Sequence, residues 1–361
     1  MSDTATSLES AFCCATRYPI LLVHGVGVRD GGRHLIWGRI PDALEKRGAK
    51  VYFGEHDAWG TPENNAVQLL ERLPAVLADS GATKVNIIAH SKGGVDARHL
   101  IAFFSPDELP IASLTTIATP HLGSRSLEVL LMTILPVLMA TAGVTNRLYS
   151  VLGDEHPDFL GTCRHLTTSY MRGFNAGQPD LSPVYSQQFA SSLHGFLDDP
   201  LSLASYAVIS LIEGPNDGLV AVESAGYDNY LGECCTAVGR GVAHARLIDA
   251  ARRPFSKRTP PGTTRMGHRH GTSWLGPQKN GTEGLSQNHN VAQLYPQNPN
   301  TAQLAQQSPD PARLDPQNPA PESVDSLENV PPQCSDCIPL QCGDILDFYI
   351  ALVADLKNRG Y

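Results

Sequence analysis

The sequence predicts an α/β fold with a mostly parallel central sheet, helices on both faces and a cap segment. One observation is that short apolar runs, which suit buried strands, alternate with longer helical patterns through residues 18–255. A second is the segment Ala89-His90-Ser91-Lys92-Gly93, which directly follows the apolar run 84–88 and has the small residues of a sharp strand-to-helix turn. Strands are expected at 18–23, 49–53, 84–90, 113–118, 183–188 and 206–213, with helices near 36–47, 65–79, 93–104 and 345–358.

The turn at Ser91 is typical of a nucleophile elbow, in which a serine at the apex presents its hydroxyl above the sheet. The backbone strain of such an apex, about 1–3 kcal/mol, requires small neighbours. Here Ala89 and Gly93 flank Ser91, and Gly94 follows. The plainer alternative is a strand–helix junction whose serine caps the helix. The elbow is favoured because the other parts of a serine hydrolase follow in the required order.

A loop that suits oxyanion binding follows the first strand, which ends in His24-Gly25. Ester hydrolysis places negative charge on the carbonyl oxygen, and each preorganised backbone N–H stabilises this charge by about 3–4 kcal/mol. We assign the two donors to the amides of Val26 and Lys92. The Lys92 side chain is expected to pair with Asp96 one helical turn on, and the alternative is a general-base lysine.

An uncharged apolar stretch at 129–144 follows the strand expected at 113–118. It is shorter than the ~20 residues that span hydrocarbon, and Pro136 interrupts it. We therefore expect a cap or lid over about 124–150 that turns an apolar helix toward a lipid surface, and the alternative is a buried cap that does not move. The residues predicted to line the pocket or lid are His24, His90, Leu130, Leu131 and Leu135.

The catalytic acid must follow the serine and precede the histidine, at the tip of a later strand. The strand expected at 206–213 leads into Pro215-Asn216-Asp217-Gly218, which makes Asp217 the candidate, although an Asp-Gly turn often has no catalytic duty. The next of the 13 histidines is His244, in a loop of small residues. His244 would take the Ser91 proton, with Asp217 holding its tautomer, and would return that proton to the leaving alcohol.

Four sequence blocks, at 19–25, 85–94, 115–124 and 216–220, resemble the motifs of bacterial true lipases, which have the α/β-hydrolase fold. They occur in the same order as in that family, and the similarity covers 18–255 and resumes at 343–361. The resemblance implies a triacylglycerol or ester hydrolase that works through an acyl-enzyme, without a cofactor. It also implies that Ser91, Asp217 and His244 form the triad.

The chain departs from this family at the structural calcium ion that many of its members bind near the histidine loop. Arg246 stands where the family places an aspartate, two residues after the catalytic histidine. Asp198 or Asp199 would match the second aspartate, but Ca²⁺ takes about six oxygen ligands. We therefore predict no calcium by this route and no metal at the site. Arg246 is expected to pair with a carboxylate such as Asp198 or Asp199.

One catalytic domain is predicted at 18–255, after an N-terminal tail at 1–17. Residues 256–343 are rich in Pro, Gln, Asn, Gly and Ser, and they contain a decapeptide repeat whose single leucines cannot bury a core. This segment is predicted to be a disordered insertion. Residues 344–361 then return to the domain as a helix with one apolar face.

The eight cysteines include the adjacent pairs at 13–14 and 234–235. Adjacent cysteines rarely bridge each other, which suits a reducing compartment. Cys334, Cys337 and Cys342 have a spacing that suits zinc, but no fourth ligand lies nearby. Free thiols are the prediction, and zinc is the alternative.

The formal net charge of −9 gives no case for nucleic-acid binding, and the basic residues at 252–258 are expected to solvate the start of the insertion. The first ten residues have no apolar h-region, so a cytoplasmic location is expected. The expected partner is a lipid or ester substrate, with transient contact to a lipid surface through the lid. Two other functions stay open: a short-chain carboxylesterase or thioesterase, and an inactive hydrolase body that binds a partner through its repeat.

Overall fold

The computed structural model describes residues 13–30, 36–103, 109–177, 184–195, 198–236, 241–250, 340–342 and 344–361. Most of the segment predicted as an insertion, including Cys334 and Cys337, lies outside these residues. The disorder predicted for this segment and the free state predicted for those two thiols therefore stay predictions.

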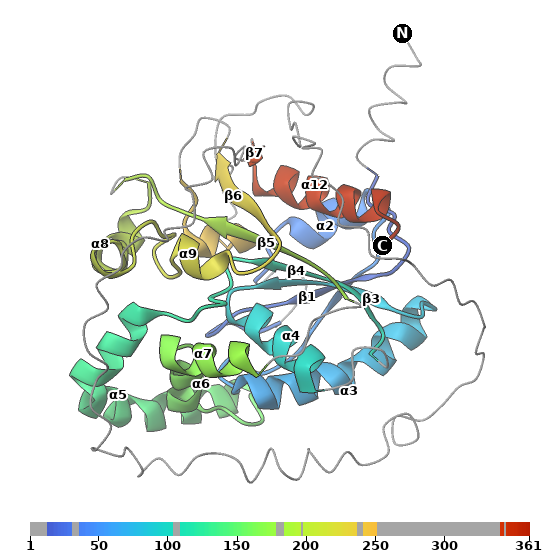
Figure 1. The fold of residues 1–361 in the computed structure, drawn as a ribbon. Helices are drawn as coiled ribbons and strands as arrows, with labels where there is room; N and C mark the ends of the chain where they lie inside the picture. Colours follow the sequence, from blue (N-terminus) through green and yellow to red (C-terminus); the bar gives the residue numbers. More distant parts are fainter. Residues whose placement is uncertain are drawn as a thin grey trace. The chain divides into compact units, whose positions relative to one another are not determined.

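A seven-stranded sheet, in which every strand pair is parallel, forms the centre of the domain (Figure 1). The strand order is β2-β1-β3-β4-β5-β6-β7, so the chain moves to one side of β1 and returns on its other side. Ligand crevices form at such a switch point, outside the carboxyl ends of the strands. The strands are β1 Ile20–Val23, β2 Val51–Phe53, β3 Val85–His90, β4 Ile111–Ile117, β5 Tyr185–Ser191, β6 Tyr230–Thr236 and β7 Leu340–Cys342.

Helices cover both faces of the sheet, with α2 and α12 on one face and α3 and α4 on the other (Figure 1). Strands β1 and β3 are therefore buried on both faces, which explains why each reads as an almost unbroken apolar run. The helices are α2 Ile40–Glu45, α3 Pro62–Ser80, α4 Lys92–Phe103, α5 Arg125–Leu152, α6 Phe159–His165, α7 Thr168–Ala176, α8 Leu203–Ile212, α9 Val222–Ala225 and α12 Ile345–Asn358, with short 3-10 turns η1 Pro200–Ser202 and η2 His244–Ile248.

The C-terminal helix α12 occupies the range that the apolar periodicity predicts. Its first turn is closed by a capping box between Asp344 and Asp347, which satisfies backbone donors at the helix start. Its apolar face is fully buried in the main core, where Phe348 packs edge-on against Phe189 of β5. This helix therefore belongs to the hydrolase domain, as predicted.

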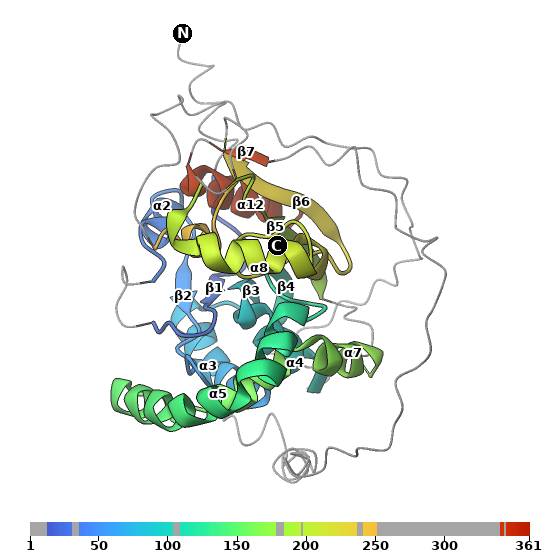
Figure 2. The same ribbon diagram turned by 90° about the vertical axis from the view of Figure 1, so that its left-hand side faces the viewer.

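The cap helix α5 is 28 residues long, close to the range 124–150 predicted for the cap, and it extends beyond the uncharged run at 129–144 on both sides. Ile134 has non-helical backbone angles. Pro136, two residues later, accounts for this kink, because proline lacks a backbone donor and clashes with the preceding turn. By length and composition alone, α5 is apolar enough to cross a membrane, a test that some core helices of soluble proteins also pass. It contacts α8, and the two helices lie on the same side of the domain (Figure 2).

Three predictions about the chain's organisation were wrong. The run expected to form a strand at 206–213 is helix α8, because an apolar run without clear periodicity suits either structure and the sheet already pairs β5 with β6. The insertion was predicted to extend to residue 343, but Leu340–Cys342 form strand β7 and pair with β6. Residues 13–17 are not a tail, since Cys14 is fully buried and its amide donates to the Arg47 carbonyl.

Candidate active site

The strand–turn–helix expected at Ser91 is present between β3 and α4. Ser91 has a φ of 56°, in the left-handed region that is strained for a residue with a side chain. Its amide donates to the Ile117 carbonyl over 2.9 Å, and its carbonyl accepts from the Thr119 hydroxyl over 2.8 Å. Hydrogen bonds to the neighbouring strand β4 and to the loop that follows it therefore hold the strained apex in place.

The glycines after Ser91 are required by close contacts. A Cβ on Gly93 would overlap the carbonyl oxygen of His24, and one on Gly94 would overlap the side chain of Thr119. The elbow is thus packed directly against the loop after β1, which explains the small residues in the motif.

Asp217 and His244 form a buried hydrogen-bonded pair. The Asp217 Oδ2 atom accepts from His244 Nδ1 over 2.7 Å, while Oδ1 accepts from the backbone amides of Leu219 and Val220 over 3.0 and 2.8 Å. Asp217 is fully buried and His244 is 6% exposed. Because the carboxylate accepts from Nδ1, the Nε2 atom of a neutral His244 is left as a proton acceptor.

His90 brings the base next to the elbow. Its ring lies 4.5 Å from the His244 ring, centroid to centroid, and its backbone directly precedes Ser91. Burial lowers the pKa of His90 well below its ordinary value, and repulsion from a protonated His244 would lower it further. His90 is therefore a neutral aromatic ring packed beside the His244 ring, and its role in the pocket stays a prediction.

The loop after β1 lies over the Ser91 hydroxyl. A Cβ on Gly25 would stand 2.7 Å from the Ser91 Cβ and 3.2 Å from its Oγ, and the amide of Val26 follows. Lys92 is the first residue of α4, where backbone N–H groups lack an intrahelical acceptor. Its ammonium group lies 2.8 Å from both carboxylate oxygens of Asp96, which confirms the predicted pairing.

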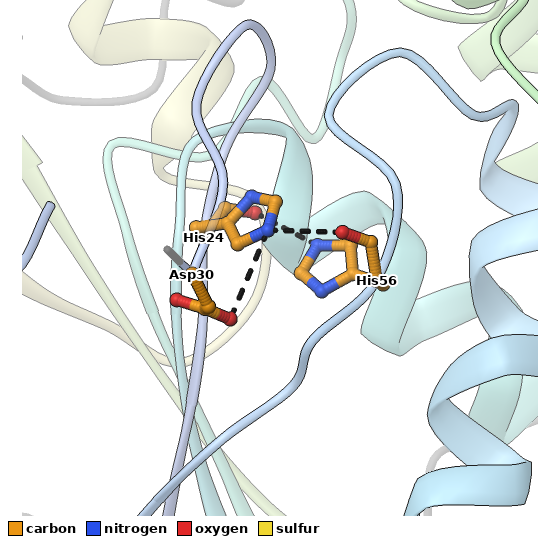
Figure 3. A group of neighbouring side chains, drawn as sticks. All are labelled: His24, Asp30 and His56. Carbon is orange, nitrogen blue, oxygen red and sulfur yellow. Dashed lines mark hydrogen bonds and ion pairs between the residues drawn. The ribbon is translucent and has the colours of Figure 1, made fainter. Parts of the chain in front are cut away.

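His24, Asp30 and His56 form the one group of potential metal ligands found among the described residues (Figure 3). The two imidazole rings stack with centroids 3.8 Å apart and planes 14° apart, so their in-plane lone pairs run side by side and do not converge. The Asp30 oxygens already accept from Trp37 Nε1 and the Glu55 amide. The group therefore fits the packing and hydrogen-bonding role predicted for His24 better than a metal centre.

Asp198, considered from the sequence as a possible calcium ligand, takes part in contacts that hold the histidine loop. One Asp198 oxygen accepts from the amides of His194 and Gly241 over 2.9 and 3.3 Å, which ties the histidine loop to the segment after β5. The amide of Val242 donates to the Ser192 carbonyl over 3.0 Å. The Asp198 Oδ2 atom thus serves protein donors, and the absence of calcium stays a prediction.

An apolar cavity of about 430 Å³ lies beside the oxyanion loop. It lies between that loop, the end of α5 and the turn η2 after His244, and its lining includes Gly27, Val28, Arg29, Ile36, Tyr149, Leu152, Ile248 and Ala250. None of the pocket leucines predicted from the sequence lines this cavity: Leu131 is buried, Leu135 is half-buried and Leu130 is 44% exposed. The sequence predicted a cap segment in the range of α5 but did not single out Tyr149, since no motif marks a tyrosine in a helix.

Comparison with known proteins identifies the family. Residues 63–147 match the family described as "Putative serine esterase (DUF676)". A triacylglycerol lipase of Vibrio cholerae is 34% identical over 245 residues, which are 60% of this chain and 77% of that protein. The chain belongs to the triacylglycerol lipase family. Its lipase relative from Burkholderia plantarii is 35% identical over 50% of this chain and 53% of its own length.

A triacylglycerol lipase of Pseudarthrobacter phenanthrenivorans is also 35% identical, over 46% of this chain and 55% of its own length. The chain thus spans about half the length of these last two relatives. A Bacillus licheniformis lipase in mature form aligns with a TM-score of 0.50 and 20% identity, covering 66% of this chain and 88% of that one. A metagenomic carboxyl esterase aligns with a TM-score of 0.51 and 17% identity, covering 64% and 65%. These likenesses confirm the predicted α/β-hydrolase fold.

Proposed function

We propose that the protein hydrolyses carboxylic esters of lipids through an acyl-enzyme on Ser91. The observation that carries this proposal is the hydrogen-bonded Asp217–His244 pair beside a serine with left-handed backbone, with the Gly25 backbone directly over its hydroxyl. Nucleophile, base and base-orienting acid are the three parts that acyl transfer requires. The names of the lipase relatives support a lipid ester as the substrate.

In this mechanism, His244 Nε2 takes the Ser91 proton as the serine oxygen attacks the ester carbonyl carbon. The oxyanion that forms accepts hydrogen bonds from the amides of Val26 and Lys92. The tetrahedral intermediate then collapses, His244 returns the proton to the leaving alcohol, and the acyl group stays on Ser91. In the second half of the reaction, His244 takes a proton from water, and the water oxygen attacks the carbonyl carbon of the acyl-enzyme. The bond to the Ser91 oxygen then breaks, His244 returns the proton to Ser91, and the carboxylic acid leaves. Asp217 remains ionised throughout and stabilises the imidazolium.

The surface of the cap supports a lipid in preference to a small soluble ester. Large apolar side chains on α5 and α8 are exposed: Val129, Leu130, Met132, Val137, Met139, Val144, Leu148, Val151, Leu152, Leu203, Val208 and Leu211. Exposed apolar patches of this kind mark interaction sites in soluble proteins. A lipid surface would cover them transiently, as the sequence-based expectation of a lid requires.

The test compares the wild-type protein with Ser91→Ala on p-nitrophenyl esters from acetate to palmitate. The substitution should lower kcat by roughly 10⁶, with the melting temperature kept, and the variant should no longer react with a labelled fluorophosphonate. Continued labelling of the variant would place the nucleophile elsewhere. A rate that does not rise when a long-chain ester passes from monomer to emulsion would favour the short-chain esterase instead.

A further inference from the structure

The oxyanion loop is held by hydrogen bonds on either side of Val26. His24 Nδ1 lies 2.9 Å from the Gly25 carbonyl oxygen, to which it donates in its Nδ1–H tautomer, and the Gly27 amide donates to the Ala58 carbonyl over 3.1 Å. Because a peptide unit is planar and trans, fixing the Gly25 carbonyl also fixes the direction of the Val26 N–H. In the described part of the chain, the Val26 amide donates to no other group, so it is free for a ligand oxygen.

The last contact on this loop comes from the cap helix. Tyr149, in the final turns of α5, donates its hydroxyl to the Gly27 carbonyl over 2.7 Å. Gly27 has a φ of 76°, a conformation that only glycine adopts without strain, and its next peptide is therefore easily rotated unless its carbonyl is held. The Tyr149 ring packs edge-on against Trp59 at 6.0 Å, which places the hydroxyl.

The same end of α5 is docked by a reciprocal pair of buried aspartates. Asp154 accepts from the amides of Ala58 and Trp59, over 3.1 and 3.0 Å. Asp57 in turn accepts from the two amides that follow Asp154, over 2.9 and 2.7 Å. Arg29 forms ion pairs with both carboxylates and neutralises part of their charge. The end of the cap, the segment before α3 and the oxyanion loop thus form one hydrogen-bonded unit.

We propose that Tyr149 is a positioning residue for the oxyanion donor. It ties the docked end of the cap helix to Gly27, next to Val26 in the same loop, so this loop is held in place only while this end of α5 stays docked. This inference rests on the proposed ester hydrolysis at Ser91. It explains why a buried carboxylate, Asp154, follows directly after an otherwise exposed helix.

The test is Tyr149→Phe in the full chain, which removes the hydroxyl and keeps the ring against Trp59. Losing a whole oxyanion donor costs about 10²–10³ in kcat, so a misplaced donor should lower kcat on p-nitrophenyl butyrate by about 10- to 100-fold. KM should stay within about twofold, because the ground-state ester does not use the full oxyanion site. The inhibition constant of phenylboronic acid, whose adduct with Ser91 is tetrahedral, should rise by the same factor as kcat falls.

Tyr52→Phe is the matched control, since the Tyr52 hydroxyl also donates one hydrogen bond, to Asp79 over 2.7 Å, on strand β2. That variant should keep the wild-type kcat and inhibition constant. A Tyr149→Phe protein with unchanged kcat, whether or not its melting temperature falls, would overturn the inference. If the wild-type protein neither cleaves the ester nor reacts with a fluorophosphonate, the proposed function fails before the inference is reached.

Discussion

The elbow region and the cap are held by different kinds of contact. Around Ser91 the side chains are buried, and polar groups such as Asp217 and Lys92 are fixed by two or more hydrogen bonds each. On α5 only Leu131 and Ala142 are buried. That helix is tied at its start, where the Ser126 amide donates to Glu213 over 2.7 Å, and at its end through Tyr149.

If the protein acts on lipid esters as proposed, this difference separates two requirements of such an enzyme. The chemistry needs atoms placed within a fraction of an ångström, which buried hydrogen bonds in a water-poor site supply. A surface that meets lipid needs exposed apolar side chains, and burying those side chains inside the protein would remove that surface. Ties at the two ends of the helix let one domain satisfy both requirements, and substitutions in each region should therefore have different signatures.

The largest expected effect in the rigid region comes from the acid. Asp217→Asn should lower kcat by roughly 10⁴ with little change in melting temperature, because the amide keeps the shape but selects the wrong tautomer of His244. Steady-state kinetics on a soluble ester and thermal melts measure both quantities.

Asp249→Asn is the matched control. Asp249 binds the Arg39 guanidinium over 2.6 and 2.8 Å, and Arg39 also binds Asp344 at the start of α12. Loss of these ion pairs should lower the free energy of unfolding by about 1–3 kcal/mol, and hence the melting temperature by several degrees. The kcat should stay nearly unchanged. If Asp249→Asn lost more kcat than Asp217→Asn, the assignment of the acid would be wrong.

The second effect is acid sensitivity of the packed region. Burial lowers the pKa of His56, His90 and His121 well below the ordinary value, and lowers the pKa of His99 to about 4. In the unfolded chain these groups take up protons below about pH 6.5, whereas the folded chain keeps them neutral. Each of these histidines should therefore lower the free energy of unfolding by about 1.4 kcal/mol per pH unit as pH falls from about 6.5 to 5.

Urea unfolding at several pH values between 7.5 and 5 measures this slope. His99→Gln should reduce this slope by about 1.4 kcal/mol per pH unit, which corresponds to one proton fewer taken up on unfolding. His156→Gln, at an exposed position, should leave the slope unchanged. A free energy of unfolding that stays constant or rises on acidification to pH 5 would show that these histidines are charged in the folded protein.

A smaller effect is expected in the cap. Met132 and Val144 are 78% and 71% exposed, so changing both to Gln removes no packing within the chain. Melting temperature and activity on p-nitrophenyl acetate should stay at wild-type values. Activity on an emulsified long-chain triacylglycerol should fall several-fold, because burying each side chain in lipid is worth about 1.5–3 kcal/mol at most. Equal losses on both substrates would mean that the cap does not meet the lipid surface.

The smallest expected effect is that of chelation, which should be none. Asp198 and the Ser192 carbonyl hold the histidine loop through Gly241 and Val242, and Arg246 carries a permanent positive charge near the position of the family's ligand. Excess EDTA should therefore leave activity and melting temperature unchanged. A drop of several degrees that added calcium reverses would reveal a cation site elsewhere in the chain.

The sequence by itself determined the parts that depend on local chemistry. An elbow requires small residues two positions before and after Ser91, and an Asp–His pair must follow in order. A helix with one apolar face can be recognised even after the long segment at 256–343. These features are visible because steric limits and periodicity act over a few neighbouring residues.

Only the tertiary structure decided the features that depend on distant neighbours. The run at 203–212 is apolar without a clear period, and its helical form follows from the lack of a free strand edge beside β5. Strand β7 is three residues long and exists through its pairing with β6. The Tyr149–Gly27 hydrogen bond joins residues 122 positions apart. Such contacts carry no sequence signal, because their energy arises only when the whole chain has closed around them.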